Sequence, residues 1–321
     1  MKVRFLLLLL AMSLCTLLYA AGGITSGSFN FSTFAVPDTP FPGSLGVEHI
    51  SNSKIIVGYT SPPSLNPTSG FTRHPNGNIV TLQDPLSSGA FQYTLASGVN
   101  TQGTVVGYYF DTANDQYSGF FYHGGTFTTY NIPGLPPYSA TTILGINEFG
   151  AICGYYQAAP AYATVPYVNW WGHIDTNFPI PASVFTEPES VNDLGVVAGS
   201  FEDSSKVFHG FIRHLDGTIT TVDVPGAAYT GTVLIGINNF GWTSGHFWDS
   251  GNHEHGFVRS PKGHFYQIDV PGADTVTPGL GTAGGGLNDE GTVVGHFDPA
   301  GGGAEIAYIA SPDFDMKNWD E

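Results

Sequence analysis

The run Gly98-Val99-Asn100-Thr101-Gln102-Gly103-Thr104-Val105-Val106-Gly107-Tyr108 decides the fold, because its pattern returns along the whole chain. The pattern is Gly, an aliphatic residue, Asn, two variable residues, Gly, a variable residue, two aliphatic residues, Gly, and finally Tyr or His. Copies occupy residues 145–155, 190–200, 236–246 and 286–296, with a degenerate copy at 49–59. The Asn position recurs every 45 to 50 residues. A fixed period of this size predicts a repeat architecture, in which each unit buries its faces against its neighbours.

Each repeat predicts four short β-strands. The Asn-x-x-Gly segment predicts a tight hairpin, because Asn and Gly tolerate positive φ. Two adjacent aliphatic residues after it predict a second strand that is covered on both faces. A third strand carries Gly-Phe, as in Gly210-Phe211, and ends in another tight turn, such as Asp216-Gly217. The fourth strand ends in Pro, which is tolerated at a strand end or a sheet edge.

The two ends of the chain complement each other. The last repeat lacks its fourth strand, and a strand of the missing type precedes the first repeat at residues 31–37. We therefore expect residues 32–36 to pair beside residues 306–310. Four-stranded units closed in this way form a β-propeller. The sequence predicts an all-β protein with one six-bladed propeller domain over residues 29–310, whereas an open stack would leave the last unit one strand short.

Residues 1–21 have the pattern of a secretory signal peptide. A short basic start precedes the apolar run 5–18, and small residues follow at 20–23. The apolar run is short for a membrane span, and no later segment is long and apolar enough to cross a bilayer. A lipid anchor at Cys15 and an uncleaved leader stay open as alternatives. We expect a secreted or extracytoplasmic protein with an acidic C-terminal tail at residues 311–321.

Charge and cysteine content exclude several classes of protein. The chain of 321 residues has 9 Lys and Arg against 26 Asp and Glu, a formal net charge of −17. Such a surface repels phosphate backbones and anionic lipids, so we expect no nucleic-acid partner. After removal of the leader only Cys153 remains, which excludes an intramolecular disulfide. Cys153 replaces Val or Ala of other repeats and is predicted to be a buried apolar side chain.

The repeats resemble the extracellular HAF-repeat family of bacterial secreted proteins. The resemblance rests on the segments 236–241 (Gly-Ile-Asn-Asn-Phe-Gly), 209–211 and 255–257 (His-Gly-Phe), and 223–226 and 269–272 (Asp-Val-Pro-Gly). It covers nearly the whole mature chain, although the first and third units depart from the pattern. The resemblance implies an extracytoplasmic repeat protein of unknown activity and transfers no catalytic residue. Some members carry a C-terminal membrane-sorting segment, which is not visible here.

Loop lengths predict where a ligand binds. The turns from first to second and from third to fourth strand are short and uniform, whereas the loops on the opposite face are long and variable. Ligand sites usually lie in loops held by a rigid scaffold. Five aromatic side chains in these long loops are the candidates for stacking on a sugar or an apolar ligand: Phe91, Tyr93, Tyr138, Phe185 and Tyr229. The alternative is that they pack the loops onto the blades.

Four aspartates recur two or three residues after the second strands: Asp111, Asp203, Asp249 and Asp298. They can start turns, or they can bind calcium at the rim of the long-loop face, since calcium prefers carboxylate and carbonyl oxygens. No other cofactor is expected. The pair His253 and His255 lacks the spacing of a helical zinc site. His209 and His255 are duplicated between units, which favours packing over catalysis.

The sequence leaves three functions open. The first is a secreted non-catalytic binding or scaffold protein, whose partner would be a carbohydrate, a cell-wall component or a protein. The second is an extracellular hydrolase or lactonase with a metal or acidic site at the channel mouth. This hypothesis rests on analogy with other propellers. The third is a purely structural protein of the envelope. Whether the chain is an enzyme, which ligand it binds and its oligomeric state are not decided by sequence.

Overall fold

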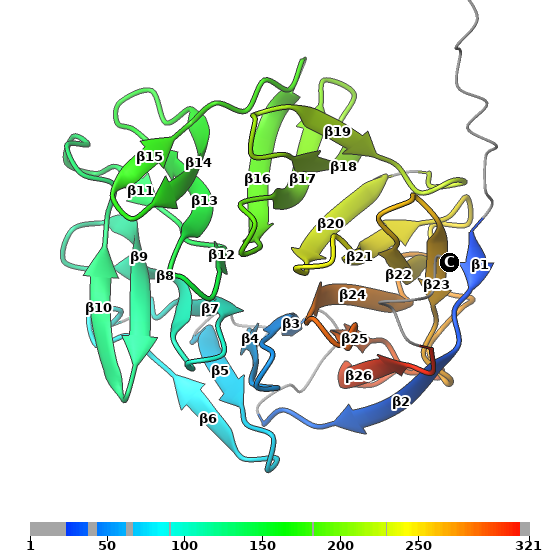
Figure 1. Cartoon of the computed structure of the whole chain (residues 1–321). Coiled ribbons are helices and arrows are strands. Elements are labelled where there is room, and N and C mark those ends of the chain that lie inside the picture. The colour runs from blue at the N-terminus through cyan, green and yellow to red at the C-terminus, as the bar shows by residue number, and fades with distance from the viewer. Residues whose placement is uncertain are drawn as a thin grey trace, which may run out of the picture.

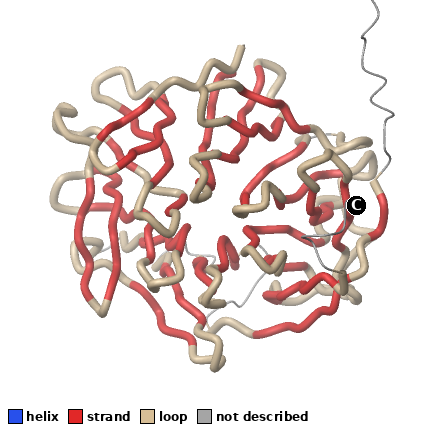
Figure 2. The backbone as a smooth tube through the Cα atoms, viewed as in Figure 1, coloured by secondary structure: helices blue, strands red, loops and turns tan. Residues whose placement is uncertain are grey.

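The computed structural model describes residues 24–37, 44–61, 67–89, 91–181, 183–228 and 230–314. Within these residues, 26 strands form six sheets arranged in a ring around a central axis (Figure 1). The region along this axis, which the innermost strands surround, is called the channel. Strands and loops alternate throughout the described chain, with no helix that could cross a membrane (Figure 2). The predicted leader 1–21, residues 315–321 of the tail and Tyr229 lie outside the described residues. The predicted six-bladed propeller is confirmed.

The first three blades follow one another from residue 45. Blade 1 consists of β3 (Leu45–Ile50), β4 (Ile56–Thr60), β5 (Ser69–Arg73) and β6 (Ile79–Leu82). Blade 2 consists of β7 (Thr94–Val99), β8 (Val105–Asp111), β9 (Gln116–His123) and β10 (Thr126–Tyr130). In blade 3 the innermost strand is broken in two, and the blade consists of β11 (Ala140–Thr141), β12 (Gly145–Ile146), β13 (Ile152–Gln157), β14 (Thr164–Trp170) and β15 (His173–Asp175).

The last three blades continue in the same order. Blade 4 consists of β16 (Ser183–Val191), β17 (Val197–Asp203), β18 (Phe208–Arg213) and β19 (Ile219–Val222). Blade 5 consists of β20 (Thr232–Ile237), β21 (Thr243–Trp248), β22 (Glu254–Arg259) and β23 (Phe265–Ile268). The chain supplies only three strands of blade 6 from its C-terminal part: β24 (Thr282–Leu287), β25 (Val293–Phe297) and β26 (Ile306–Pro312).

The N-terminal segment closes the ring. β2 (Phe29–Phe34) pairs antiparallel with β26, with Phe29 opposite Pro312 and Phe34 opposite Ala307. This register confirms the predicted closure. The N-terminal segment also forms a second pairing that the repeat did not predict. Its strand β1 (Thr25–Ser26) pairs parallel with β23 as a fifth strand of blade 5. One short stretch of chain therefore ties two neighbouring blades together.

The core is divided among the six interfaces between blades. Each of six clusters of buried apolar side chains joins two neighbouring sheets. The adjacent residues Val105 and Val106 face different interfaces, since Val105 packs between blades 1 and 2 and Val106 between blades 2 and 3. The prediction of a second strand covered on both faces is thus confirmed. Cys153 is fully buried between blades 3 and 4, where burial raises the pKa of its thiol well above the usual value.

The innermost strands share a local irregularity that bears on the channel. In five blades the pairing of the first with the second strand shifts register near the end of the first strand. In β3 the shift falls between Val47 and His49, and in β16 between Pro188 and Ser190. A β-bulge redirects the side chain of the extra residue. The bulged residues of these two strands are Glu48 and Glu189.

Candidate functional site

The short turns at one end of the channel are held by the repeated asparagine. In blade 4, Oδ1 of Asn192 accepts hydrogen bonds from the backbone N–H groups of Leu194 (3.0 Å) and Val196 (2.9 Å). Asn147, Asn238 and Asn288 accept from the residues two and four positions further along in the same way. These are Asx turns, in which the side chain satisfies backbone donors that the hairpin leaves over. The predicted hairpin is confirmed, but only its Gly has a positive φ, such as +80° at Gly195, and the Asn acts through its side chain instead.

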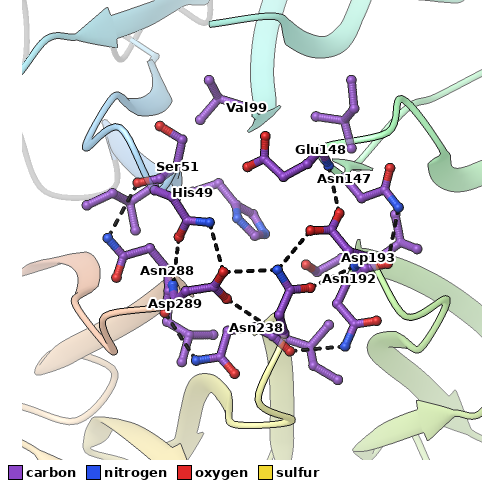
Figure 3. Close-up of a pocket in the computed structure, with 18 residues that line it drawn as sticks. His49, Ser51, Val99, Asn147, Glu148, Asn192, Asp193, Asn238, Asn288 and Asp289 are labelled. Atoms are coloured by element: carbon purple, nitrogen blue, oxygen red, sulfur yellow. Dashed lines mark hydrogen bonds between the residues drawn. The ribbon is translucent and has the colours of Figure 1, made fainter. Parts of the chain in front are cut away.

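The same asparagines also join neighbouring blades, a role that the repeat pattern did not predict. Nδ2 of each donates to the backbone carbonyl oxygen of its counterpart in the next blade. The donor–acceptor distances are 3.2 Å from Asn147 to Asn192, 3.0 Å from Asn192 to Asn238 and 3.2 Å from Asn238 to Asn288. Longer contacts of 3.5 Å and 3.4 Å run from Asn100 to Asn147 and from Asn288 to Ser51. We call this chain of contacts the asparagine relay (Figure 3).

A second relay runs through the residues that follow the asparagines. The backbone N–H of Asp193 donates to Oδ1 of Asn239 at 2.8 Å, and that of Asn239 donates to Oδ1 of Asp289 at 2.9 Å. The backbone N–H of Glu148 likewise donates to Oδ1 of Asp193, and that of Asp289 donates to Oδ1 of Asn52. Nδ2 of Asn239 bridges the carboxylates of Asp193 and Asp289 at 2.8 and 2.9 Å. The carboxylates at this mouth are therefore engaged in bonds between blades.

Both relays are interrupted between blades 1 and 2. Ser51 stands where the other blades have Asn, and its Oγ caps its own turn by accepting from the N–H of Ile55 at 3.1 Å. The shorter side chain donates to no carbonyl of blade 2, and Oγ of Ser53 donates to the carbonyl of Thr101 at 3.0 Å instead. Between blades 1 and 2, this single hydrogen bond from Ser53 therefore replaces the Asn side-chain bond that joins the other blades.

The cavity enclosed by these turns is too small for a sugar. Its volume is about 50 Å³, whereas ligand pockets usually span about 300–1,000 Å³. The His49 imidazole lies in the middle of it, at a position where most blades have Gly, and its Nε2 is 3.3 Å from the carbonyl oxygen of Ile235 (Figure 3). Burial lowers the pKa of His49 to about 4, so the ring is neutral. The hydrogen bonds at this end of the channel join neighbouring blades.

The side chains at the last position of the repeated stretch lie together at the opposite, long-loop end of the channel. In blades 1 to 6 this position is occupied by Tyr59, Tyr108, Tyr155, Ser200, His246 and His296. The ring of Tyr59 lies across the innermost strand, because a Cβ on Gly46 would come within 2.1 Å of its Cε1 atom. Tyr93, just ahead of β7, joins this group, with its ring centroid 5.9 Å from that of Tyr108.

Three glutamates lie beside these tyrosines: Glu48 on β3, and Glu187 and Glu189 on β16, on the other side of the channel (Figure 1). Burial, with the charge of Glu187, raises the pKa of Glu48 to about 7. Burial likewise raises the pKa of Glu187 to about 7 and that of Glu189 well above its usual value, with Glu187 and Glu48 adding to the latter shift. No hydrogen bond or ion pair within the described part of the chain compensates these three carboxylates.

Blades 5 and 6 present a different chemistry at the same end. Nε2 of His246 lies 3.7 Å from Oε1 of Glu254, and Nε2 of His296 lies 4.0 Å from Oε1 of Glu305. Burial lowers the pKa of His296 to about 4, which keeps this imidazole neutral. The long-loop end thus has one sector of tyrosines and carboxylates and another of histidine–glutamate pairs.

The predicted ligand-binding aromatics are divided between two places. Tyr93 and Phe185 belong to the channel end, because Phe185 makes an edge contact with Tyr155 at a centroid distance of 5.6 Å. Phe91, 40% exposed, stacks on Tyr93 at 6.3 Å and extends the group outward. Tyr138, 60% exposed, lies on the loop between blades 2 and 3. Ligand binding by these residues stays a prediction, and Tyr229 lies outside the described residues.

The four predicted calcium ligands lie one to a blade. Asp203 and Asp249 are near the repeated histidines: Nε2 of His209 is 3.6 Å from Asp203, and Nε2 of His255 is 3.5 Å from Asp249. A second aspartate accepts from Nδ1 of each histidine at 2.8 Å. Asp111 and Asp298 are buried and accept backbone hydrogen bonds. Across the described ranges no group of three or more His, Cys, Asp or Glu is arranged to hold a metal ion.

Sequence reasoning missed the tyrosines of the repeat and the channel glutamates. A signal for the former was present, because the last position of the repeated stretch is Tyr, His or Ser in every unit, directly after a Gly that all six units share. For the glutamates the signal was weaker: Glu48 and Glu189 share the position directly before the repeated stretch, but the other units have Ser, Leu, Ile or Gly there. The convergence of the glutamates depends on two bulged strands facing each other across a ring, which no spacing along the chain reveals.

Comparison with known proteins supports the architecture. No family model matches the chain, and no curated protein matches it, so the resemblance to HAF repeats stays a prediction. Among solved structures, AofleA from Arthrobotrys oligospora is 12% identical, with a TM-score of 0.54 over 90% of both chains. Lectin structures from Aleuria aurantia are similarly distant. One in complex with Fucα1-6GlcNAc has a TM-score of 0.48 at 12% identity, covering 85% of this chain and 97% of the lectin. Likeness at this identity shows the six-bladed fold alone.

Removing one link of the asparagine relay should destabilise the whole ring. We expect Asn192→Ala to lower the free energy of unfolding by about 2–4 kcal/mol, since it removes two capping bonds and the bond to Asn238. Asn76→Ala is the matched control, because Asn76 caps an exposed turn through a single bond to Asn78. Denaturant unfolding measures both. Equal costs for the two variants would contradict the relay.

The channel glutamates should make stability depend on pH. The pKa of Glu48 is higher in the folded protein than its ordinary 4.5, so its contribution is favourable below about pH 4.5 and is lost as the pH rises through about 7. We expect Glu48→Gln to raise the free energy of unfolding above wild type by about 1–3 kcal/mol near pH 8.5 and to change little near pH 4.5. Glu148→Gln, at the other mouth, is the control. A pH-independent effect of Glu48→Gln would contradict this account.

Proposed function

We propose that the protein is a carbohydrate-binding propeller whose ligand docks at the long-loop end of the channel. The observation that carries the proposal is the juxtaposition of tyrosine rings with three glutamates that no described cation neutralises. The closed opposite mouth, with its 50 Å³ cavity, directs the ligand to this end. The seven-residue group formed by these side chains is called the channel-end site: Glu48, Tyr59, Tyr93, Tyr108, Tyr155, Glu187 and Glu189.

The aromatic half of the site suits the apolar face of a sugar ring. Aromatic side chains combine a large contact area with little conformational freedom to lose, and Tyr adds a hydroxyl for hydrogen bonding. Tyr93 is braced by edge contact with Tyr117 at 5.6 Å, and Tyr155 is braced by Phe185. Rings held in this way are pre-organised, so their positions cost little to fix on binding.

The acidic half of the site suits hydroxyl or amino groups of a sugar. Protonated carboxyl groups can donate as well as accept, and above about pH 7 the ionised carboxylates of Glu48 and Glu187 accept hydrogen bonds roughly twice as strong as neutral ones. Glu48, Glu187 and Glu189 make none within the described structure, so a ligand supplies donors that the protein lacks. Above about pH 7, where Glu48 and Glu187 become ionised, their charges also repel uronic acids, sialic acids and sulfated sugars. The site therefore favours neutral or amine-bearing glycans.

The leader at residues 1–21 supports export from the cytoplasm, and the repeat pattern supports kinship with the HAF-repeat proteins. Both are part of this proposal. A glycan-binding protein of this kind would meet polysaccharides of the cell wall or of the surroundings. A net charge of −17 would keep it from adhering to anionic polymers.

Glycan binding can be tested directly with the secreted form. We expect an array of neutral and amine-bearing glycans to retain the protein. Tyr93→Ala and Glu187→Gln should each weaken binding about tenfold by calorimetry. Trp171→Ala is the control, because Trp171 is an exposed aromatic residue in the turn joining β14 and β15 on the opposite face. Failure to retain any glycan, or equal binding by all variants, would refute the proposal.

The raised pKa values favour glycoside hydrolysis as a second candidate function. A carboxyl group with a pKa near 7 can act as a general acid at neutral pH while a neighbouring ionised carboxylate acts as base or nucleophile. Glu48 and Glu187 both have pKa values of about 7, so either one can be the general acid while the other, once ionised, is the base or nucleophile.

Product analysis separates the two candidates. Release of reducing ends from a bound glycan, abolished in both Glu48→Gln and Glu187→Gln but kept in Glu148→Gln, would establish hydrolysis. Binding without any turnover would leave the non-catalytic function in place.

A further inference from the structure

One buried aspartate occupies a position that is apolar in the other blades. At the end of the outermost strand, the backbone N–H of Asp84 donates to Oγ1 of Thr94 at 3.0 Å. Val224 and Val270 make the equivalent bond to Thr232 and Thr282 at 3.0 and 3.2 Å. Asp84 therefore has the same place in its blade as these two valines, and a carboxylate replaces a buried methyl-bearing side chain.

The carboxylate of Asp84 is only half satisfied. Asp84 is 1% exposed, and its Oδ1 accepts from the backbone N–H of Leu86 at 2.9 Å. Its Oδ2 is buried and has no hydrogen-bond partner within the described residues. An uncompensated buried carboxylate is costly unless a proton or a cation neutralises it. This orphan oxygen is the observation that points to a ligand.

A second buried carboxylate, Asp111 of blade 2, lies within electrostatic reach of Asp84. Its Oδ1 accepts from the backbone N–H groups of Ala113 and Asn114, and its Oδ2 accepts from Nδ2 of Asn114 at 2.7 Å, so it meets a cation through the remaining lone pairs. Asp111 is 5% exposed, and its charge adds to the burial that raises the pKa of Asp84. Both carboxylates also raise the pKa of Tyr109, which places this ring next to them. The two loops are joined, because Thr112 donates from N and Oγ1 to the carbonyl oxygen of Leu86 at 3.4 and 3.2 Å. No Lys or Arg of the described chain forms an ion pair with either aspartate.

We propose that a calcium ion binds between Asp84 and Asp111 and bridges blades 1 and 2. Calcium suits the place because every available ligand is an oxygen and because it tolerates irregular geometry, whereas Mg²⁺ requires a near-ideal octahedron. The ion compensates the orphan Oδ2 and supplies the link between blades 1 and 2 that the asparagine relay lacks there. With two carboxylates the affinity falls in the range of extracellular calcium modules, about 10⁻⁴–10⁻³ M.

Terbium luminescence tests the site in the full chain, because Tb³⁺ replaces calcium and Tyr109 can sensitise its emission. We expect a saturable emission that Ca²⁺ displaces, that is lost in Asp84→Asn and Asp84→Val, and that is retained in Asp203→Asn. Asp203 is the matched control, since it occupies the position of Asp111 in blade 4 and interacts with His209.

Thermal unfolding gives the second measurement. We expect ~5 mM CaCl₂ to raise the melting temperature of the wild type by about 3–5 °C over EDTA and to leave Asp84→Val unchanged. MgCl₂ should have little effect. A wild type that responds to neither ion, or an Asp84→Val variant that keeps the response, would overturn the proposal.

Discussion

Closure of the ring is the constraint on which the rest of the structure depends. No blade can bury both of its faces alone, so every apolar cluster lies between two sheets and each sheet requires both neighbours. The last interface forms only if the chain ends meet, which β2 and β26 accomplish by pairing along their whole length. The asparagine relay joins neighbouring blades through polar groups as well. Each Asn side chain caps its own turn and donates a hydrogen bond to the turn of the next blade.

The residues that depart from the repeat are concentrated where the molecule can do chemistry. In blade 1, His49 and Ser51 stand where most other blades have Gly and Asn, Asp84 replaces an apolar residue, and Glu48 shares its position only with Glu189 of blade 4. In blade 4, Glu187 and Glu189 enter the channel from the other side. Positions that break a local rule without a structural gain are those where function is expected. Blades 1 and 4 supply the three glutamates of the proposed channel-end site, blades 1 to 3 supply its tyrosines, and blades 1 and 2 supply the two aspartates of the proposed cation site.

The sequence predicted the architecture well because the repeat encodes it locally. The Asn-x-x-Gly turn, the doubly covered Val105-Val106 pair and the displaced strand at residues 31–37 each fix one feature of a propeller without knowledge of distant contacts. The parallel pairing of β1 with β23 was missed, because two residues carry no periodic signal. The candidate site was predicted only in part. Tyr93 was singled out from its loop position, and Phe185, expected in a loop, lies on β16 beside Tyr155. Glu48 and Glu187 come near each other through ring geometry that one strand's sequence does not contain.

The most direct test of the account is a covalent link across the closure. Ser32 and Ile309 are opposite residues in the β2–β26 ladder, and opposite Cα atoms in such a ladder lie within disulfide range. In the double variant Ser32→Cys, Ile309→Cys, oxidation should form an intramolecular disulfide in nearly every molecule and raise the melting temperature above that of the reduced form. A protein that stays reduced, or that links only between molecules, would contradict closure of the ring by its N-terminal strand.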